Sequence, residues 1–321
     1  MVSSRQFGFA VLAGILASLP LAAHAWGCDG HELVALVAQK HMNQRAQKEA
    51  EALLQQNPID PSLKRYCSTR STDPFVDSAT WADDYRDVDK STGDWHYLDI
   101  PLGADDSNPD QFCPAAGCVT KAITDQVAIL KSTDADPQKR AMALRFVIHF
   151  TGDLHQPLHV VTNTDRGGNC VPVAYFTKKP KADGHGGYSP NLHHVWDTEI
   201  VQRMMGKRPL EQVASDLDGA FTSRASTWQA SGIELTAWAQ ETHRLAVDIA
   251  YGKLPVTVHV EEVQPIQSCT DDDDIGKRML ALDETIGKPY EASAELTVKR
   301  QLARAGVRLA LILNDVWPEA K

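Results

Sequence analysis

The segment from His149 to His159 constrains the fold most, because it crowds histidine and aspartate into an otherwise apolar stretch. His149 and Asp153 lie four residues apart, so on a helix they project from the same face. Pro157 ends such a helix and lets His159 return toward that face from a different direction. Charged side chains among apolar residues need partners. The segment therefore predicts a helix whose end carries a buried polar cluster.

A second pair repeats this spacing. His193 and Asp197 are again four residues apart, and the residues around them, Leu192, Val195 and Trp196, are apolar. A lone pair of this kind is more often an ion pair on a solvated surface. Two pairs that are both set among apolar residues are hard to explain in that way, because buried charges need partners. Two helices that each present histidine and aspartate on one stripe form a cage for borderline metals such as zinc.

The start of the chain has the pattern of an export signal. Residues 1–25 contain one basic residue, Arg5, followed by an apolar run from Phe7 to Leu21, and they end in Ala23-His24-Ala25. This ending predicts that a signal peptidase cuts before Trp26. An uncleaved anchor is the alternative, but the run is short and interrupted beside the roughly 20 apolar residues of a membrane span. We expect a secreted or periplasmic protein with no membrane anchor in its mature form.

Residues 26–321 are predicted to form one domain, because this length suffices for a large core and no flexible linker divides it. The whole chain has a formal net charge of −10. An acidic chain has no overall field that attracts polyanions, and the basic stripe of a groove-binding nucleic-acid protein is missing. A substrate that carries phosphate must be held by something other than net charge, and bound metal is the obvious candidate.

The cysteine count is even, which in an exported protein favours disulfides. Cys113 and Cys118 flank the turn-forming Pro-Ala-Ala-Gly, so a local bridge is expected between them. The other four cysteines allow three pairings, and the sequence does not choose among them: Cys28, Cys67, Cys170 and Cys269. No Cys-x-x-Cys arrangement occurs, which argues against a zinc site made of thiolates.

The fold class is predicted to be all-α: a single, mainly helical domain with minor short strands and a metal cluster at the bottom of a cleft. Apolar residues recur at helical spacing in several stretches: Leu33–His41, Ala46–Leu54, Ile123–Leu130, Ala141–Leu154, Leu192–Met205, Leu235–Tyr251 and Leu296–Leu313. Val171–Phe176 and Val256–Val260 alternate like short strands or extended loops. Residues 101–117 and 178–190 are rich in glycine, proline and aspartate and are expected to be surface loops.

Three further segments add candidate side chains: Trp26-Gly-Cys-Asp-Gly-His31, Trp81-Ala-Asp83-Asp-Tyr-Arg86 and Asp94-Trp-His96-Tyr97-Leu-Asp99. Together with the segments His149–His159 and 191–197 they make five motifs in a fixed order. On these motifs the sequence resembles the S-one/P-one-type nuclease family, within the zinc-dependent phospholipase C/nuclease superfamily. The resemblance extends from Trp26 to the C-terminal stretch 301–310.

The resemblance implies three Zn²⁺ ions and nine ligand residues. One zinc would be held by Asp83, His96, His149 and Asp153. A second would be held by the amino group and carbonyl oxygen of Trp26, with His31 and the shared Asp153. The third would be held by His159, His193 and Asp197. Because the α-amine of Trp26 becomes free only when residues 1–25 are removed, maturation would itself complete the site.

The resemblance also implies hydrolysis of single-stranded DNA or RNA to products with 5′ phosphates, and 3′-nucleotidase activity. Asp153, shared by two zinc ions, and Arg86, one helical turn after Asp83, are the implied catalytic residues. Tyr97 would stack on an unpaired base, and Asp99 would accept hydrogen bonds from its edge. Asn169 is implied as a phosphate contact or as support for a ligand.

Two other functions compete with this interpretation. Related zinc cages hydrolyse phospholipids, so a zinc-dependent phospholipase C is the first alternative. A non-catalytic zinc-binding or storage protein is the second, although it leaves Arg86 and Tyr97 unexplained. The substrates expected are single-stranded nucleic acid and 3′-nucleotides, and no stable protein partner is implied. The basic stretch 177–190 is either a rim that contacts more distant phosphates or a tolerated surface insertion.

Overall fold

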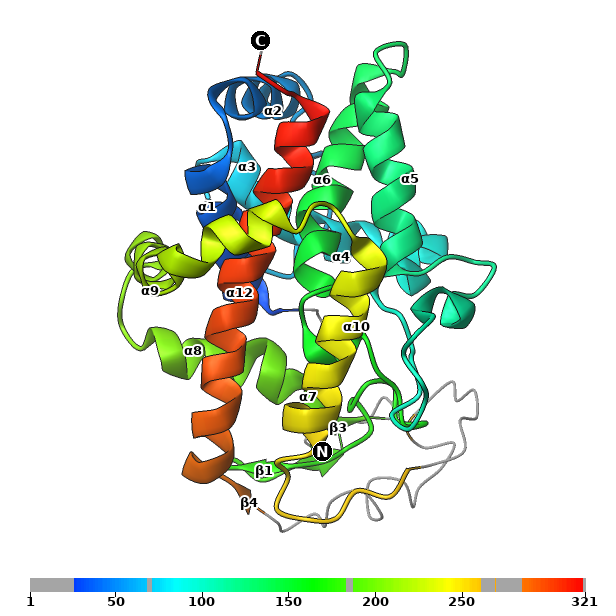
Figure 1. Ribbon diagram of the computed structural model, residues 1–321, viewed down its shortest axis with the longest axis vertical. Coiled ribbons are helices and arrows are strands. Elements are labelled where there is room, and N and C mark those ends of the chain that lie inside the picture. The colour runs from blue at the N-terminus through cyan, green and yellow to red at the C-terminus, as the bar shows by residue number, and fades with distance from the viewer. Residues whose placement is uncertain (1–25, 68–70, 183–186, 261–268, 270–284, 320–321) are drawn as a thin grey trace, which may run out of the picture.

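The computed structural model describes residues 26–67, 71–182, 187–260, 269 and 285–319 (Figure 1). The predicted signal peptide, residues 1–25, lies outside these residues. The described chain is mainly helical with short strands, as predicted. Its α-helices are α1 (Cys28–His41), α2 (Gln44–Gln56), α3 (Pro74–Asp77), α4 (Trp81–Tyr85), α5 (Val119–Lys131), α6 (Pro137–Asp153), α7 (Leu192–His194), α8 (Ile200–Met205), α9 (Leu210–Ala230), α10 (Leu235–Leu245) and α12 (Lys288–Val316).

Tighter and wider helical turns complete this framework. The 3₁₀ turns are η1 (Ser78–Thr80), η2 (Lys90–His96), η3 (Pro109–Phe112) and η4 (Pro157–His159), and the π-helical turns are η5 (Val195–Glu199) and η6 (Ala246–Tyr251). The strands of the described chain are two residues long. β1 (Ala174–Tyr175) pairs in parallel with β4 (Thr285–Ile286), and β2 (Lys181–Ala182) pairs antiparallel with β3 (Tyr188–Ser189).

Helix α12 is the axis of the fold. It runs along the long axis of the molecule in Figure 1 and packs against α1, α9 and α6. Its crossing with α1 is close, because a Cβ atom at Gly306 would lie 2.5 Å from the Cβ of Val37 and 2.9 Å from the carbonyl oxygen of Val34. A residue larger than glycine would push the two helices apart. The close crossing keeps α1, which carries His31, fixed against the centre of the core.

Helix α6 is defined by clear signals at both ends. The Asp136 side chain accepts hydrogen bonds from the backbone N–H groups of Gln138 and Lys139, and Pro137 occupies the first turn, where its missing N–H is harmless. The helix ends at Asp153, and Pro157 then starts the turn η4. The chain therefore leaves the helix and turns within a few residues, so that His159 approaches the buried cluster from a separate element, as the position of Pro157 predicts.

The seven predicted helical stretches all coincide with helical structure, and the structure adds one long helix that the sequence pattern did not indicate. Helix α9 buries only a few apolar side chains along its length, so its pattern is too sparse for periodicity to reveal. Val256–Val260 forms no strand, so the extended-loop alternative is correct there. The expected loop 178–190 contains the pair β2 and β3, and its residues 183–186 lie outside the described residues.

Three disulfides join the six cysteines: Cys28–Cys67, Cys113–Cys118 and Cys170–Cys269. The expected local bridge is confirmed. The structure chooses one of the three pairings that remained open for the other four cysteines. Among the residues that the structure describes, no helix combines the length and the apolar character that crossing a bilayer would require.

Candidate metal centre

Three groups of buried histidine and aspartate side chains lie where α1, α4, α6 and η5 converge. They are His31 with His149 and Asp153, then Asp83 with His96 and His149, and finally His159 with His193 and Asp197. Within each group the donor atoms lie within 4.8 Å of one another. Each of these side chains belongs to a residue that is at most 5% exposed. The structure thus brings together every histidine and aspartate that the sequence motifs suggested as a ligand.

Asp153 stands between the first two groups. Its Oδ2 lies 3.0 Å from Nδ1 of His96 and 3.3 Å from Nε2 of His149, while its Oδ1 lies 3.3 Å from Nε2 of His31. A carboxylate whose two oxygens face different histidines can bridge two cations. His149 belongs to both groups, whereas the family resemblance placed it with Asp83, His96 and Asp153 only.

Backbone carbonyl groups orient three of the rings. In each case Nδ1–H donates to a carbonyl oxygen at 2.7 Å: His149 to Ala79, His159 to His96, and His193 to Gly167. In the neutral ring this leaves the lone pair of Nε2 directed into the cluster. Hydrogen bonds of this kind fix both the tautomer and the angle of a metal-binding imidazole.

The third group gives the clearest test of whether these residues suit a metal. The Nε2 atoms of His159 and His193 lie 3.0 Å apart, and each ring already uses its Nδ1–H elsewhere. Two lone pairs that face each other repel unless a cation lies between them. Nitrogen ligands at about 2.0–2.1 Å from a tetrahedral zinc stand about 3.3 Å apart, close to the spacing found. Asp197 completes the group, with Oδ2 at 3.2 Å from Nε2 of His193.

The first two groups also contain buried polar atoms that have no hydrogen-bond partner within the described structure. Both ring nitrogens of His31, Nε2 of His96 and Oδ1 of Asp153 are buried and make no hydrogen bond within the described structure. Burial, followed by repulsion from His149, lowers the pKa of His31 to about 3. Burial likewise lowers the pKa of His96 to about 4. These rings are therefore neutral and can donate to a metal.

His149 differs from its neighbours. Burial opposes its charged form, but Asp153 and Asp83 outweigh burial and raise its pKa to about 9. Two buried carboxylates thus share one compensating proton. The cluster is short of positive charge, which is the condition that a bound divalent cation would relieve.

Trp26 is packed into the same region. The residue is fully buried, and its indole Nε1 donates to the carbonyl oxygen of Gly152 at 2.9 Å. A Cβ atom at Gly152 would lie 2.9 Å from Nδ1 of His31, so the glycine gives the ring room. Gly27 N–H donates to the carbonyl oxygen of Asp197 at 2.9 Å. The backbone at Trp26 is therefore held beside both the first group, which contains His31, and the third group, which contains Asp197.

Arg86, Tyr97 and Asp99, the residues expected to contact substrate, lie just after the elements that carry Asp83 and His96. Arg86 follows α4, and its Nη2 is 3.7 Å from Oδ1 of Asp83. Tyr97 directly follows His96, is half-buried, and donates its hydroxyl to Oδ1 of Asp94 at 2.7 Å. Asp99 is an exposed residue, and desolvation of its carboxyl by the surrounding protein, followed by nearby carboxylates, raises its pKa to about 7.

Comparison with known proteins agrees with this centre. The family model described as S1/P1 Nuclease matches residues 26–318, which is nearly the whole described chain. The chain belongs to the S1/P1 nuclease family. It is therefore a nuclease, a phosphodiesterase, and the three buried clusters are consistent with a multinuclear metal site of this family.

Individual relatives extend over similar lengths. This S1/P1 nuclease is 28% identical to endonuclease 2 of Arabidopsis thaliana over 306 residues, covering 92% of this chain and 91% of the relative. It is 26% identical to nuclease P1 of Penicillium citrinum over 316 residues, covering 91% and 97%. It is 29% identical to nuclease S1 of Aspergillus oryzae over 229 residues, covering 66% and 69%.

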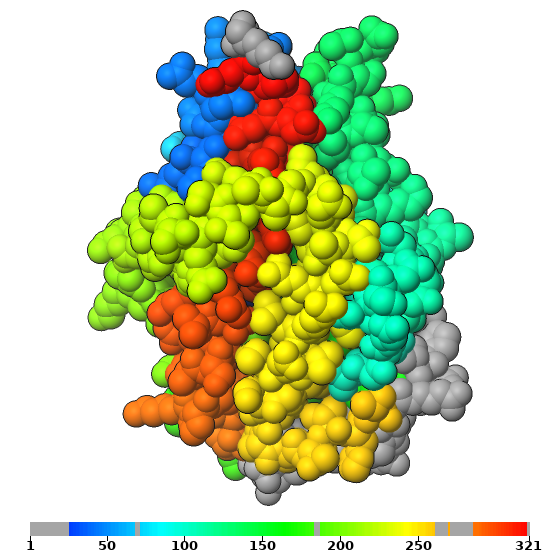
Figure 2. Space-filling model, viewed as in Figure 1, coloured from blue at the N-terminus to red at the C-terminus, as the bar shows by residue number. Residues whose placement is uncertain are grey.

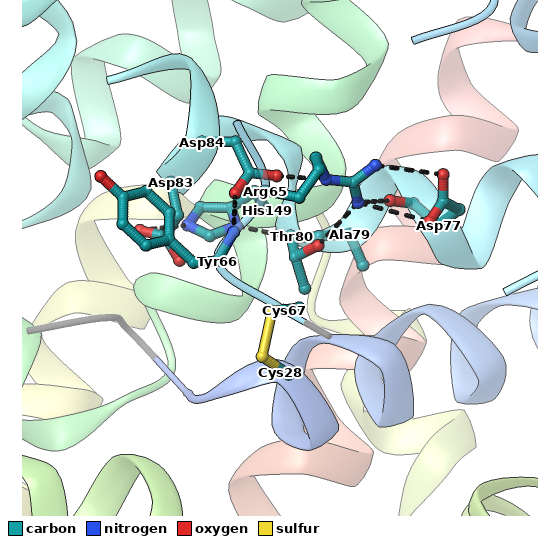
Figure 3. Close-up of a disulfide and its surroundings, with 10 residues drawn as sticks. All are labelled: Cys28, Arg65, Tyr66, Cys67, Asp77, Ala79, Thr80, Asp83, Asp84 and His149. Atoms are coloured by element: carbon teal, nitrogen blue, oxygen red, sulfur yellow. Dashed lines mark hydrogen bonds and ion pairs between the residues drawn. A yellow bond between two sulfur atoms is a disulfide. The ribbon is translucent and has the colours of Figure 1, made fainter. Parts of the chain in front are cut away.

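A network that the sequence did not reveal connects the segment of the nuclease around Asp83 to helix α1, which carries His31 (Figure 3). Arg65 forms ion pairs with Asp84 and Asp77, and the N–H of Tyr66 donates to Oδ1 of Asp84 at 2.8 Å. The next residue, Cys67, is bonded to Cys28 at the start of α1. This network ties the neighbour of Asp83 to the helix that carries His31. The repeated aspartate in Trp-Ala-Asp-Asp was the only sequence signal for it.

Gln156 and Gly167 were also missed. Nε2 of Gln156 donates to Oδ1 of Asp197 at 2.6 Å, which leaves Oδ2 facing His193. Gly167 has φ 60°, and a Cβ atom there would lie 2.2 Å from the carbonyl oxygen of Leu158. Only glycine fits that turn, whose carbonyl orients His193. Asn169 lies in the same turn, where its amide donates to the carbonyl oxygen of Arg166 at 2.9 Å.

Proposed function

We propose that this nuclease is a three-zinc enzyme that hydrolyses single-stranded DNA and RNA. Its products would carry 5′ phosphates, and it would also remove the phosphate from 3′-nucleotides. The observation that carries the proposal is Asp153, whose two oxygens face His31 on one side and His96 and His149 on the other. In a chain of this family, that arrangement supports a pair of metal ions that act on one phosphate.

The ligand assignment is the one that the family resemblance implies, with Asp153 shared by two ions and His149 given to one. Asp83, His96, His149 and Asp153 would hold one ion. The backbone of Trp26 would hold a second with His31 and Asp153, and His159, His193 and Asp197 would hold the third. Removal of residues 1–25 would free the α-amine of Trp26 for this purpose. Bound zinc would polarise the phosphodiester and lower the pKa of a water nucleophile.

Arg86 would act on the substrate itself. Its guanidinium lies beside Asp83 and is only partly buried, so it can turn toward a phosphoryl oxygen. Two N–H groups of one guanidinium can bind two phosphoryl oxygens and offset the negative charge that grows as the bond to phosphorus breaks. Gln156 would keep Asp197 in place, because the Gln156 amide donates a hydrogen bond to one oxygen of the Asp197 carboxylate.

Tyr97 and Asp99 support the choice of a single strand. The hydroxyl of Tyr97 is tied to Asp94, which fixes the ring next to His96. A flat ring stacks only on a base that has left its pair, so stacking favours unpaired nucleotides without a basic groove. Asp99, two residues further on, would form hydrogen bonds with the edge of the stacked base, and Asn169 would contact a phosphate.

The location proposed for the enzyme is outside the cytoplasm, either secreted or periplasmic, after cleavage before Trp26. The disulfides support this location. Three disulfides join all six cysteines, and disulfides persist in oxidising compartments.

The first experiment measures zinc content together with hydrolysis of single-stranded DNA, on protein whose N-terminus is confirmed as Trp26. We expect about three zinc ions per chain, loss of activity on chelation, and products with 5′ phosphates. Fewer than two tightly held ions, or zinc without hydrolysis, would overturn the proposal. Faster turnover of a short-chain phosphatidylcholine than of single-stranded DNA would make the enzyme a phospholipase C instead.

A second experiment separates catalysis from zinc storage. Arg86→Ala should keep its zinc and lose about 10²–10³-fold in kcat, which is the usual loss when one donor to a developing charge is removed. Arg208→Ala is the matched control, because that arginine pairs with exposed Asp216 away from the clusters. Full activity of Arg86→Ala would exclude the assigned role.

A further inference from the structure

A row of arginines lines a groove between α10 and α12, outside the metal centre. Arg300, Arg304 and Arg308 are four residues apart on α12, so they share one face of the helix. The groove has a volume of about 470 Å³, and α10 contributes Glu241 and Arg244 to its other wall. In Figure 2 the middle of α12 lies recessed between α9 and α10.

The arginine row has too little negative charge around it. Glu241 is the one carboxylate paired with the row in the described structure: its Oε1 lies 2.7 Å from Nη1 of Arg304, and its Oε2 lies 3.0 Å from Nη1 of Arg308. Arg244 pairs instead with Asp106, at 2.9 Å. Glu241 therefore pairs with two of the three guanidinium groups, and Arg300 forms no ion pair with a described residue, in a protein whose net charge is −10.

Two of these guanidinium groups are buried rather than solvated. Arg304 is 6% exposed and Arg308 is 5% exposed, and they lie over the rings of Trp228 and Trp238 at 5.1 and 4.6 Å from the ring centroids. The Nε atoms of Arg300, Arg304 and Arg308 are buried and make no hydrogen bond within the described structure. Burial, with repulsion from neighbouring arginines, lowers the pKa of Arg304 to about 10 despite the attraction of Glu241.

Such a row is unfavourable unless an anion joins it. Like charges four residues apart on a helix repel, and a buried charge without a full partner is expensive. Guanidinium groups match the oxygens of phosphate with paired N–H donors. A groove of this volume accommodates a phosphate together with an attached nucleoside.

We propose that the groove between α10 and α12 is a phosphate-binding site, separate from the metal centre, in which Arg300, Arg304 and Arg308 hold the anion. The phosphate belongs either to a strand that the enzyme is degrading or to a free ion in solution. Only the first source rests on the proposed function.

Two side chains of α12, Arg308 and Gln301, also contact His155, which lies close in sequence to Asp153. Nη1 of Arg308 donates to Nε2 of His155 at 3.0 Å, and Nε2 of Gln301 donates to the carbonyl oxygen of His155 at 2.9 Å. Nδ1 of His155 in turn donates to the carbonyl oxygen of Thr151 at 2.7 Å. His155 stands two residues after Asp153. An anion in the groove therefore binds arginines that brace the end of α6.

The test is titration of the zinc-loaded enzyme with inorganic phosphate by calorimetry. Arg300→Gln should raise the dissociation constant for phosphate at one class of site by about tenfold. This is the effect of losing one charge-assisted contact. Glu241→Gln should strengthen the same class by about tenfold, because it removes the competing carboxylate. Arg300 is half-buried and forms no ion pair with a residue that the structure describes, so its replacement is mild for folding. A lower phosphate affinity in one variant and a higher affinity in the other cannot both result from partial unfolding.

Lys299→Gln is the matched control. Lys299 is the next residue on α12 and loses the same charge, but it pairs with Glu295 and does not line the groove. It should titrate like the wild type. If Arg300→Gln and Glu241→Gln also titrate like the wild type, or shift in the same direction, the site does not exist.

Hydrolysis assays then distinguish the two sources of phosphate. If a strand occupies the groove, Arg300→Gln should raise KM about tenfold for a long single strand and leave a dinucleotide unaffected. The dependence of log KM on log salt should also weaken by about 0.7, the share of one phosphate contact in a single strand. If a free ion occupies the groove, KM should not change for either substrate while the titration still shifts. Absence of hydrolysis by the wild type would overturn the proposed function alone.

Discussion

The Nε2 atoms of His159 and His193 face each other at 3.0 Å, while both Nδ1 atoms are committed to backbone carbonyl groups. The pair therefore has no proton to share in its neutral form. Burial lowers the pKa of both rings, so protonation does not resolve the contact at neutral pH. A cation held between the rings does resolve it.

Replacing one ring should remove one metal. His193→Gln is expected to lower the zinc content by about one ion per chain, because the third group loses a ligand and keeps only two. Elemental analysis of the purified variant measures this. His194→Gln is the control, since that ring lies outside the cluster and faces Glu199 at 3.7 Å. A His193→Gln variant with the full zinc content would contradict the ligand assignment.

The turn at Gly167 should tolerate no side chain. Gly167→Ala places a Cβ atom against the carbonyl oxygen of Leu158 and needs a positive φ, so we expect a loss of about 2 kcal/mol or more in the free energy of unfolding. Zinc content should fall too, because the carbonyl of this turn orients His193. Chemical denaturation and elemental analysis test both effects.

Gly219→Ala provides the comparison for this variant. Gly219 lies on α9 with nothing within 4 Å of the added atom. The substitution should raise the free energy of unfolding by about 0.5–1 kcal/mol, as alanine does in exposed helix. Equal effects of the two substitutions would mean that the turn is not tightly packed.

The disulfide Cys28–Cys67 should stabilise the protein more than Cys113–Cys118. The two bridges close loops with sequence separations of 39 and 5 residues, so loop entropy predicts losses of about 4 and about 2 kcal/mol when each pair is changed to serine. The first variant should also bind zinc more weakly, because its bridge ties Arg65 and Tyr66 to α1. Thermal unfolding and zinc competition with a chelator measure these effects, and a reversed order would contradict them.

Glu199 should make stability depend on acid pH. His194 lowers the pKa of Glu199, and Lys178 adds to this, so that the value falls to about 2 despite partial burial. A carboxyl whose pKa is lower in the folded state stabilises the protein above its unfolded pKa, and that stabilisation disappears as pH falls from about 4.5 toward about 2. Glu199→Gln should lose about 1–2 kcal/mol at neutral pH and progressively less in acid.

Urea unfolding of metal-free protein at several pH values checks this sign. Glu295→Gln serves as the control, because its pair with Lys299 is a helix-surface contact of small value. If the difference between wild type and Glu199→Gln stayed constant from neutral pH into acid, the lowered pKa would not be the cause.

The sequence by itself determined the chemistry of this protein. The spacing of His149 and Asp153, repeated by His193 and Asp197, places a histidine and an aspartate on one face of a helix in each case, whatever surrounds them. Pro157 and the Asp136-Pro137 start define the ends of α6 locally. The short bridge Cys113–Cys118 is likewise local, since a turn of a few residues brings both cysteines together.

Only the tertiary structure decided how these parts meet. The carbonyl groups of Ala79, His96 and Gly167 orient three imidazoles, and every residue type has a carbonyl, so no side-chain pattern reveals which ones serve. The pairings Cys28–Cys67 and Cys170–Cys269, the place of His149 in two groups, and the arginine groove against α10 all depend on segments far apart in the chain. Their proximity follows from packing around α12, which local sequence patterns do not encode.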